Sequence, residues 1–163
     1  MPDFDKTLLK SIKLIGFDVD GVLTGGEIIY SSTGTETKAF NVKDGLGIKL
    51  LQEKGIKTAI ITGRTSTIVE HRAQELGIDK LFQGVANKAS KLDELCQAYD
   101  LKPEEVAYMG DDLPDLSILE KVGLAACPAD AMQEVKAACT FISQFPGGKG
   151  AARELCDLIR QAH

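Results

Sequence analysis

The sequence predicts an α/β fold in which a mostly parallel β-sheet forms the middle layer. Short apolar segments alternate with longer segments of helical periodicity, which is the pattern of successive β-α-β units. The chain has 163 residues, of which 44% are hydrophobic, enough to bury one core of ordinary size. The sequence contains no internal repeat, low-complexity tract or linker. We therefore expect one domain over residues 1–163.

Six apolar segments have the length and composition of strands. In chain order they are residues 12–17, 57–61, 80–83, 106–109, 123–126 and 140–142. The third and the sixth are the weakest of these signals. With helices between them, the segments predict a Rossmann-like three-layer domain.

The first long helical segment covers residues 43–54. Its periodicity places Leu46, Leu50 and Leu51 on one face, and it ends at Gly55. We expect that leucine face to pack on the sheet.

Further helices are marked by their capping residues. Thr67 and Glu70 have the spacing of a capping box, and Asn87 is suited to cap the next helix. Asp112, followed closely by a proline, is suited to start another, because proline is tolerated in the first turn. A last helix is expected over residues 151–161, within a glycine-containing C-terminal tail of residues 145–163.

Residues 25–42 interrupt the α/β alternation. Two β-prone stretches, 27–31 and 36–40, flank a turn at Thr33 and Gly34. This pattern predicts a β-hairpin.

The overall charge disfavours sequence-independent binding of nucleic acid. The net charge is −5 and the isoelectric point is about 5.1, whereas binding to a phosphate backbone needs a basic surface. Anionic small molecules must then be bound by local groups.

Apolar runs such as residues 14–17 are far too short for a membrane span or a signal sequence, so we expect a cytoplasmic protein without a membrane partner. The four cysteines are too widely spaced for a metal or redox motif and are interpreted as reduced thiols of the core.

Polar residues follow three of the predicted strands directly. They are Asp18 and Asp20 after the first, Thr62 after the second, and Asp111, Asp112 and Asp115 after the fourth. In an open parallel sheet the ligand site lies at the carboxyl ends of the strands, where the strand order reverses. If the first and fourth strands are neighbours, the carboxylates converge. Such a cluster is unstable unless some of the carboxylates are protonated or a cation lies among them, and oxygen ligands favour magnesium, manganese or calcium.

The spacing of Asp18 and Asp20 suits phosphoryl transfer. Residues two apart on an extended chain point the same way, so both carboxylates can face the site while Val19 packs beneath. One carboxylate can attack phosphorus while the other protonates the leaving oxygen and later activates water. Lys88 can neutralise the phosphate oxygens, and Thr62 can donate a hydrogen bond.

The run Asp18-Val19-Asp20-Gly21-Val22-Leu23-Thr24 resembles the first motif of the haloacid dehalogenase superfamily of phosphatases. Thr62, Lys88 and the run from Gly110 to Asp115 match its other three motifs in order. The resemblance implies that Asp18 is the nucleophile and a metal ligand. It also implies that Asp20 is the acid/base and a backbone ligand of Mg²⁺, and that Asp111 completes the metal site. Asp112 and Asp115 would be additional ligands or would position Lys88.

Segments outside these motifs resemble the 3-deoxy-D-manno-octulosonate 8-phosphate phosphatase family. They are the hairpin, the runs 40–47 and 61–64, and the tail segment 147–154. This narrower resemblance implies a magnesium-dependent phosphatase of a sugar acid phosphate in lipopolysaccharide precursor biosynthesis. It also implies a homotetramer without a cap domain, in which neighbouring subunits complete each active site. Substrate-binding roles are then expected for Gly45, Arg64 and Arg153, with Arg64 facing the substrate carboxylate.

Two alternatives stay open at this point. The first is the same chemistry on a nine-carbon sialic or deaminated sialic acid 9-phosphate. The second is a signalling receiver domain, which also accepts phosphate on an aspartate. Against the receiver, the third predicted strand lacks the aspartate that such domains phosphorylate there, and Asp20 supplies an acid/base for turnover.

Overall fold

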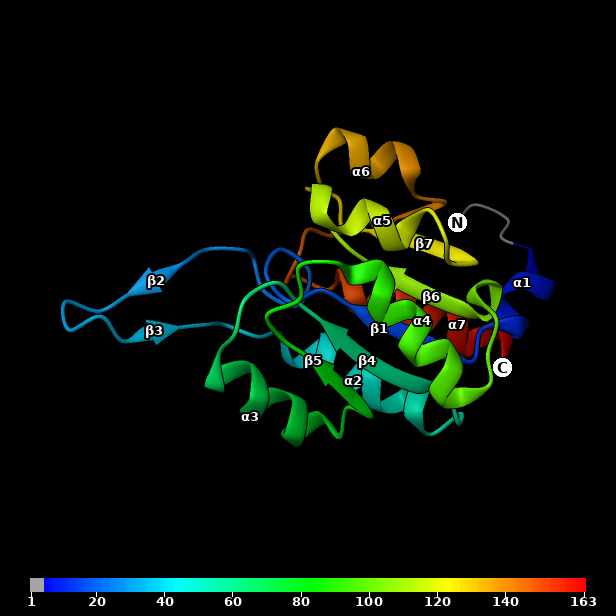
Figure 1. Cartoon of the computed structure of the whole chain (residues 1–163), viewed down its shortest axis with the longest axis horizontal. Helices are drawn as coiled ribbons and strands as arrows, with labels where there is room; N and C mark the ends of the chain where they lie inside the picture. Colours follow the sequence, from blue (N-terminus) through cyan, green and yellow to red (C-terminus); the bar gives the residue numbers. More distant parts are fainter. Residues whose placement is uncertain (1–4) are drawn as a thin grey trace.

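A parallel sheet of six strands forms the middle layer of the computed structural model, which describes residues 5–163 (Figure 1). The strands are β1 (Leu14–Phe17), β4 (Lys57–Ile61), β5 (Lys80–Phe82), β6 (Val106–Met109), β7 (Leu124–Cys127) and β8 (Phe141–Ile142). They lie in the order β5-β4-β1-β6-β7-β8, with each neighbouring pair parallel. The predicted fold class is confirmed.

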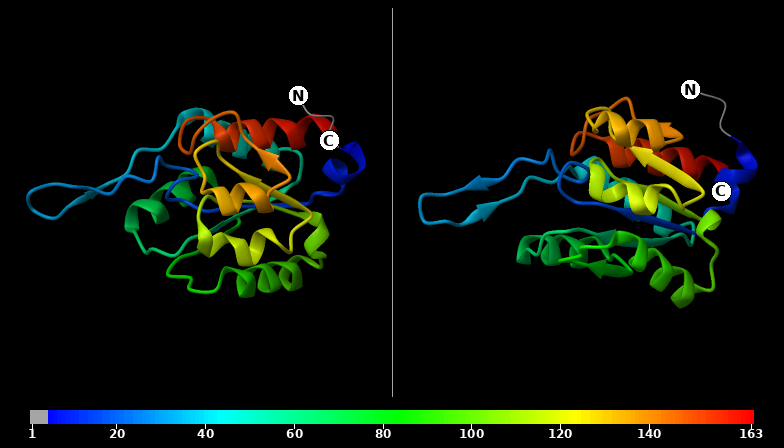
Figure 2. Two further views of the ribbon diagram at one scale, coloured as in Figure 1. Left: turned by 90° about the horizontal axis from the view of Figure 1, so that it is seen from above. Right: turned by 45° about the horizontal axis from the view of Figure 1, so that its top comes forward.

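Helices cover both faces of this sheet (Figure 2). One face carries α1 (Lys6–Ser11), α2 (Val42–Gln52), α3 (Thr67–Leu76) and α7 (Ala151–Ala162). The other carries α4 (Lys88–Tyr99), α5 (Leu116–Leu119) and α6 (Gln133–Ala138), with the short 3₁₀ helices η1 (Pro103–Glu105) and η2 (Leu113–Asp115). Successive residues of a strand serve opposite cores: Met109 packs under the first helical layer and Tyr108 under the second.

The predicted strands match the observed ones closely. β4 and β6 have the predicted bounds, and the others differ by one or two residues at their ends. The largest shift is at β1, which starts at Leu14 because Ile12 closes helix α1 by donating its N–H to the Leu9 carbonyl.

The predicted inner face of α2 was wrong in part. Leu51 is buried as expected, but Leu46 is 49% exposed, and Gly45, Gly47 and Ile48 face inward instead. A side chain at Gly47 would meet Arg153 of α7. Neighbouring helices lie close against this face of α2, and that close approach explains the small residues there.

Two predicted caps need correction. Helix α3 is capped by Ser66, whose hydroxyl accepts a hydrogen bond from the Ile68 N–H, and not by Thr67. Asn87 precedes α4 at the cap position but makes no side-chain capping bond. Asp112 does cap its helix, by accepting from the Leu113 N–H.

The predicted hairpin is present, with shorter strands than expected: β2 (Ile29–Tyr30) pairs antiparallel with β3 (Glu36–Thr37). It projects from one end of the molecule, as Figure 1 shows on the left. Phe40 does not belong to its exposed surface, because that ring packs against the core beneath the guanidinium of Arg72.

The C-terminal tail is part of the folded body. The Gly148 N–H donates to the Val22 carbonyl (2.8 Å), which fastens the tail to the loop after β1. Asp44 accepts hydrogen bonds from the backbone N–H groups of Gly150 and Arg153, so it caps α7 from a distance. Five residues of α7 are fully buried: Ala151, Ala152, Leu155, Cys156 and Ile159.

All four cysteines are free thiols, as predicted. Cys127 and Cys156 are buried, whereas Cys96 and Cys139 are half-buried. Between residues 5 and 163, no helix has the length and apolar character needed to cross a membrane.

Candidate active site

The candidate site lies where the strand order reverses. From β1 the chain continues to β4 and β5 on one side, and then returns to build β6, β7 and β8 on the other. The first strand and the strand at 106–109 are neighbours, which is the condition for the carboxylates to converge, since Phe17 pairs with Met109. Their carboxyl ends therefore open into one crevice.

A pocket of about 350 Å³ occupies this crevice. Eight of the ten predicted site residues line it: Asp18, Asp20, Thr62, Arg64, Lys88, Asp111, Asp112 and Asp115. Gly26, Gly63 and Pro114 complete the wall. Residues from three loops, separated by about a hundred positions in the sequence, thus meet at one place.

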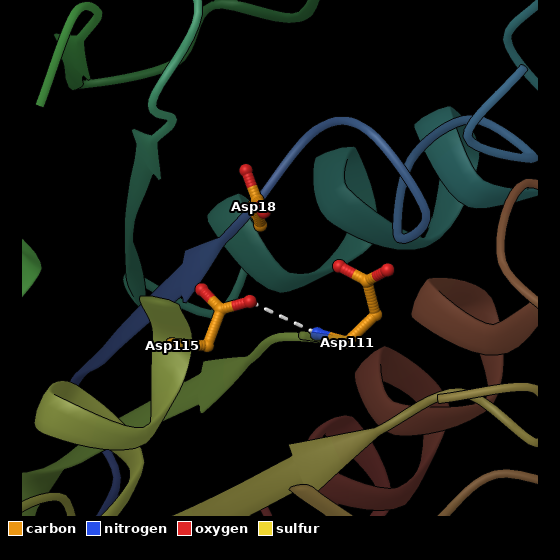
Figure 3. Close-up of side chains that lie close together, drawn as sticks. All are labelled: Asp18, Asp111 and Asp115. Carbon is orange, nitrogen blue, oxygen red and sulfur yellow. Dashed lines mark hydrogen bonds between the residues drawn. The ribbon is translucent and has the colours of Figure 1, made fainter. Parts of the chain in front are cut away.

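Three carboxylates form the centre of the pocket. Oxygen atoms of Asp18, Asp111 and Asp115 lie within 4.8 Å of one another (Figure 3). Burial raises the pKa of Asp18 to about 6, and the nearby ammonium of Lys88 counters that only in part. Burial, together with the charge of Asp18, raises the pKa of Asp111 to about 7. The surrounding side chains therefore do not fully compensate the negative charge that three ionised carboxylates would carry.

Asp115 organises this cluster through both of its oxygens. Oδ1 accepts hydrogen bonds from Lys88 (2.6 Å) and from the Tyr108 hydroxyl (2.9 Å). Oδ2 accepts from the backbone N–H groups of Asp111 (3.0 Å) and Asp112 (3.3 Å). Because both oxygens already have two donors, Asp115 fits a positioning role better than that of a metal ligand.

The oxygens of Asp18 and Asp111 suit a divalent cation. A hard cation prefers carboxylate oxygens, and its charge would favour the ionised form of both groups, whose pKa values are raised mainly by burial. The backbone leaves space for this arrangement, because a side chain at Gly21 would overlap the Asp111 carboxylate. Gly21 also has a φ of 85°, a conformation that favours glycine. Asp20, the third predicted ligand, does not add its carboxylate to the cluster, so its predicted backbone contact stays a prediction.

Lys88 is held in the pocket by charge. Its side chain is 3% exposed, and its ammonium lies 2.9 Å from Asp18 Oδ2 and 2.6 Å from Asp115 Oδ1. Burial lowers the pKa of Lys88, but the two carboxylates outweigh that effect and raise it. The lysine therefore stays protonated next to the proposed nucleophile.

Asp20 belongs to a second set of charged side chains. The ammonium of Lys38 contacts Asp20 Oδ1 and lies 3.5 Å from Glu36 Oε1. Arg64 contacts the same Glu36 oxygen at 2.6 Å and approaches Asp20 Oδ2 at 3.9 Å. Asp20, Lys38, Glu36 and Arg64 thus form a closed ring of alternating charges, which we call the charge ring.

Two predicted site residues do not reach this pocket within one chain. Gly45 is buried in α2, where a side chain would meet Arg72 and Leu76 of α3. The Arg153 guanidinium pairs with Asp157 on α7 at 2.6 Å. Substrate-binding roles for Gly45 and Arg153 stay predictions that depend on a neighbouring copy of the chain.

Sequence reasoning missed Tyr108, Glu36 and Lys38. The signal for Tyr108 was present, because a buried tyrosine needs a partner for its hydroxyl, and this one lies in a strand that ends at the acidic run. Nothing in the sequence places the hairpin stem beside Asp20, so Glu36 and Lys38 had no comparable signal.

Known proteins resemble the chain over most of its length. The family profile of haloacid dehalogenase-like hydrolases matches residues 80–155. The 3-deoxy-D-manno-octulosonate 8-phosphate phosphatase KdsC of Escherichia coli K12 is 45% identical over 150 residues, which covers 92% of this chain and 80% of that protein.

Solved structures agree with this similarity. The phosphatase of the same name from Moraxella catarrhalis, in complex with magnesium, phosphate and KDO, has a TM-score of 0.94 and 44% identity, covering 97% of this chain and 91% of that one. The cobalt-bound enzyme from Haemophilus influenzae has a TM-score of 0.91 and 41% identity, covering 95% and 91%. The chain therefore belongs to the haloacid dehalogenase-like hydrolases and, within them, to the 3-deoxy-D-manno-octulosonate 8-phosphate phosphatase family.

Proposed function

We propose that this protein hydrolyses 3-deoxy-D-manno-octulosonate 8-phosphate to the free sugar acid and inorganic phosphate. The observation that carries the proposal is the geometry at Asp18: a largely buried carboxylate, oriented by Lys88, that lines an acidic pocket. Family membership supplies the substrate, because the similar proteins bear the name of that activity.

Asp18 is the nucleophile in this account. Its Oδ1 accepts a hydrogen bond from the Val19 N–H (2.6 Å), and its Oδ2 faces the Lys88 ammonium (2.9 Å). The carboxylate is therefore fixed before substrate arrives, which removes an entropic cost from the attack on phosphorus. Lys88 then stabilises the charge that accumulates on the transferred phosphoryl oxygens.

Asp20 acts as the acid and then the base. It protonates the sugar oxygen as the ester bond breaks, and it accepts a proton from the water that hydrolyses phospho-Asp18. Its carboxylate lines the same pocket and is held outside the three-carboxylate cluster by the charge ring.

Mg²⁺ is the proposed cofactor. Asp18 and Asp111 would hold it, together with the Asp20 backbone carbonyl that the family resemblance implies. When bound, the ion neutralises the phosphate and allows an anionic nucleophile to approach it.

Metal removal has an expected pH signature. Because folding raises the pKa of Asp111 from 3.8 to about 7, the folded protein binds this proton more tightly than the unfolded chain does, and stability decreases as pH rises from 3.8 to about 7. The chelated protein should be inactive, and its melting temperature should fall as pH rises from about 4 to about 7 and then level off. Mg²⁺ should restore activity and raise the melting temperature more at the higher pH.

The control for this experiment is Asp111→Asn. That variant should show a flatter pH profile and a much smaller response to Mg²⁺ in a thermal melt. A metal-free protein that keeps full activity, or a magnesium response independent of pH, would contradict the assignment of Asp111.

Substrate choice is tested with a panel of phosphorylated sugars in magnesium. Arg64 is 38% exposed at the pocket rim and is proposed to bind the substrate carboxylate. We expect the highest kcat/KM for the eight-carbon 8-phosphate. A higher kcat/KM for a nine-carbon sialic acid 9-phosphate would reassign the substrate while keeping the chemistry.

A homotetramer is proposed on the evidence of the hairpin. Ile28, Ile29 and Tyr30 are 57%, 49% and 59% exposed, forming an apolar surface on a two-stranded ribbon. Such a ribbon is marginally stable alone, so contacts between subunits would explain its persistence.

We expect light scattering to give four times the mass of one chain, and Ile29→Lys to reduce it. Ile142→Lys, which changes an equally exposed apolar residue on strand β8, serves as the control and should leave the mass unchanged. A wild-type monomer at assay concentration would contradict the proposal.

A further inference from the structure

Lys38 is a buried cation with no role in the catalytic steps proposed above. Its side chain is 1% exposed, although it follows the outermost part of the projecting hairpin by only a few residues. A buried ammonium is unfavourable unless it is paired. Its partners are Asp20 and Glu36, so Lys38 fastens the stem of the hairpin to the proposed acid/base.

The position of Asp20 also needs an explanation. Asp20 lies two residues beyond Asp18, and a cation bound at Asp18 and Asp111 would attract its carboxylate. A carboxylate that binds the metal through its side chain is less able to exchange a proton with the leaving group. In the structure the Asp20 carboxylate lies outside the cluster, with Oδ1 on Lys38 and Oδ2 facing Arg64.

We propose that Lys38 is a positioning residue for Asp20: its ammonium holds the Asp20 carboxylate apart from the metal-binding carboxylates and available for proton transfer. The proposal rests on the proposed function, since it assumes that Asp20 is the general acid. Glu36 completes the arrangement, because it pairs with both Lys38 and Arg64 and so prevents the two cations from repelling each other.

The charge ring also connects the hairpin with the substrate pocket. Glu36 belongs to β3, Asp20 follows β1, and Arg64 follows β4. Any displacement of the hairpin stem would therefore move Asp20 and Arg64, the groups proposed for the leaving oxygen and the substrate carboxylate. Hairpin packing and proton transfer are then coupled through Lys38.

The test uses the dependence on the leaving group in the full-length enzyme with magnesium. A sugar alkoxide is a poor leaving group and needs protonation, whereas p-nitrophenolate leaves readily without it. Comparing kcat/KM for the eight-carbon sugar phosphate and for p-nitrophenyl phosphate isolates the step in which the ester bond breaks.

Lys38→Met keeps the length of the side chain and removes its charge. We expect it to lower kcat/KM for the sugar phosphate about tenfold or more, and for the aryl phosphate by less than about threefold. Lys38→Arg retains a cation and should restore most of the sugar phosphate activity. An equal loss on both substrates, or no loss, would show that the charge ring only supports the fold and would overturn the proposal.

Asp20→Asn is measured beside Lys38→Met, so that failure of the general-acid role can be distinguished from failure of the positioning role. If Asp20→Asn itself shows no preference for the better leaving group, the general-acid role fails. If Asp20→Asn shows it and Lys38→Met does not, only the positioning role fails. Should Lys38→Met not fold, as judged by its thermal melt, Glu36→Gln weakens the same ring with Lys38 still paired to Asp20. Glu36→Gln must then lower kcat/KM by less than the loss expected for Lys38→Met, and must still lower it more for the sugar phosphate than for the aryl phosphate. Any other result would overturn the proposal.

Discussion

Replacing Asp18 by asparagine should abolish turnover, with kcat/KM reduced by about a thousandfold or more. The substitution keeps the size of the side chain but removes the charged oxygen that attacks phosphorus. It also removes the charge of one of the two carboxylates proposed to bind magnesium, so the apparent magnesium affinity should fall as well. Steady-state phosphate release at saturating magnesium is the measurement.

A matched control is Asp93→Asn, the same chemical change on the exposed outer face of α4. It should behave as the wild type does. If Asp18→Asn kept a kcat near that of the wild type while remaining folded, nucleophilic attack by Asp18 would be excluded.

Replacing Lys88 by methionine should lower both activity and stability. The side chain is 3% exposed, and its ammonium pairs with both Asp18 and Asp115. Its loss leaves two buried carboxylates without their paired cation, which costs about 3 kcal/mol of unfolding free energy in comparable buried pairs. Without the cation, charge on the phosphoryl oxygens is less well stabilised, and kcat/KM should fall about a hundredfold or more.

Lys91→Met provides the comparison on the same helix. Lys91 lies one turn further along α4, is 32% exposed and pairs with Glu94 at 2.7 Å. Exposed pairs of this kind contribute little, so both stability and activity should stay close to the wild-type values. Urea unfolding and kinetics on both variants decide between a buried functional cation and a general effect of removing charge from α4.

The sheet and most of the pocket were predictable because they depend on local patterns. Strands such as β6 are apolar throughout, as expected where a parallel strand is covered on both faces. The acidic residues that follow these strands must meet wherever the strands are neighbours. Asp18 and Asp111 could thus be placed at one site from the sequence, and the resemblance to the phosphatase motifs added Lys88.

The features that the sequence did not predict depend on contacts between segments that are distant in the sequence. The inner face of α2 was misassigned because the close approach of α7 at Gly47 has no signature within α2 itself. The fastening of the tail by the Gly148 N–H to the Val22 carbonyl is another such contact, and the expected reach of the tail to a neighbouring subunit's active site stays a prediction. The pairing of Lys38 with Asp20 likewise depends on how the hairpin folds back, which alternation and capping rules do not describe.

The most direct test of the account is to trap the phosphorylated enzyme. The wild type is mixed with substrate and magnesium, quenched in acid during the first turnover, and its peptides are examined by mass spectrometry. We expect a phosphoryl group on the peptide that contains Asp18, absent when Asp18→Asn is treated in the same way. Rapid release of phosphate with no phosphorylated Asp18 at any time, or with phosphate on another residue, would contradict the covalent mechanism.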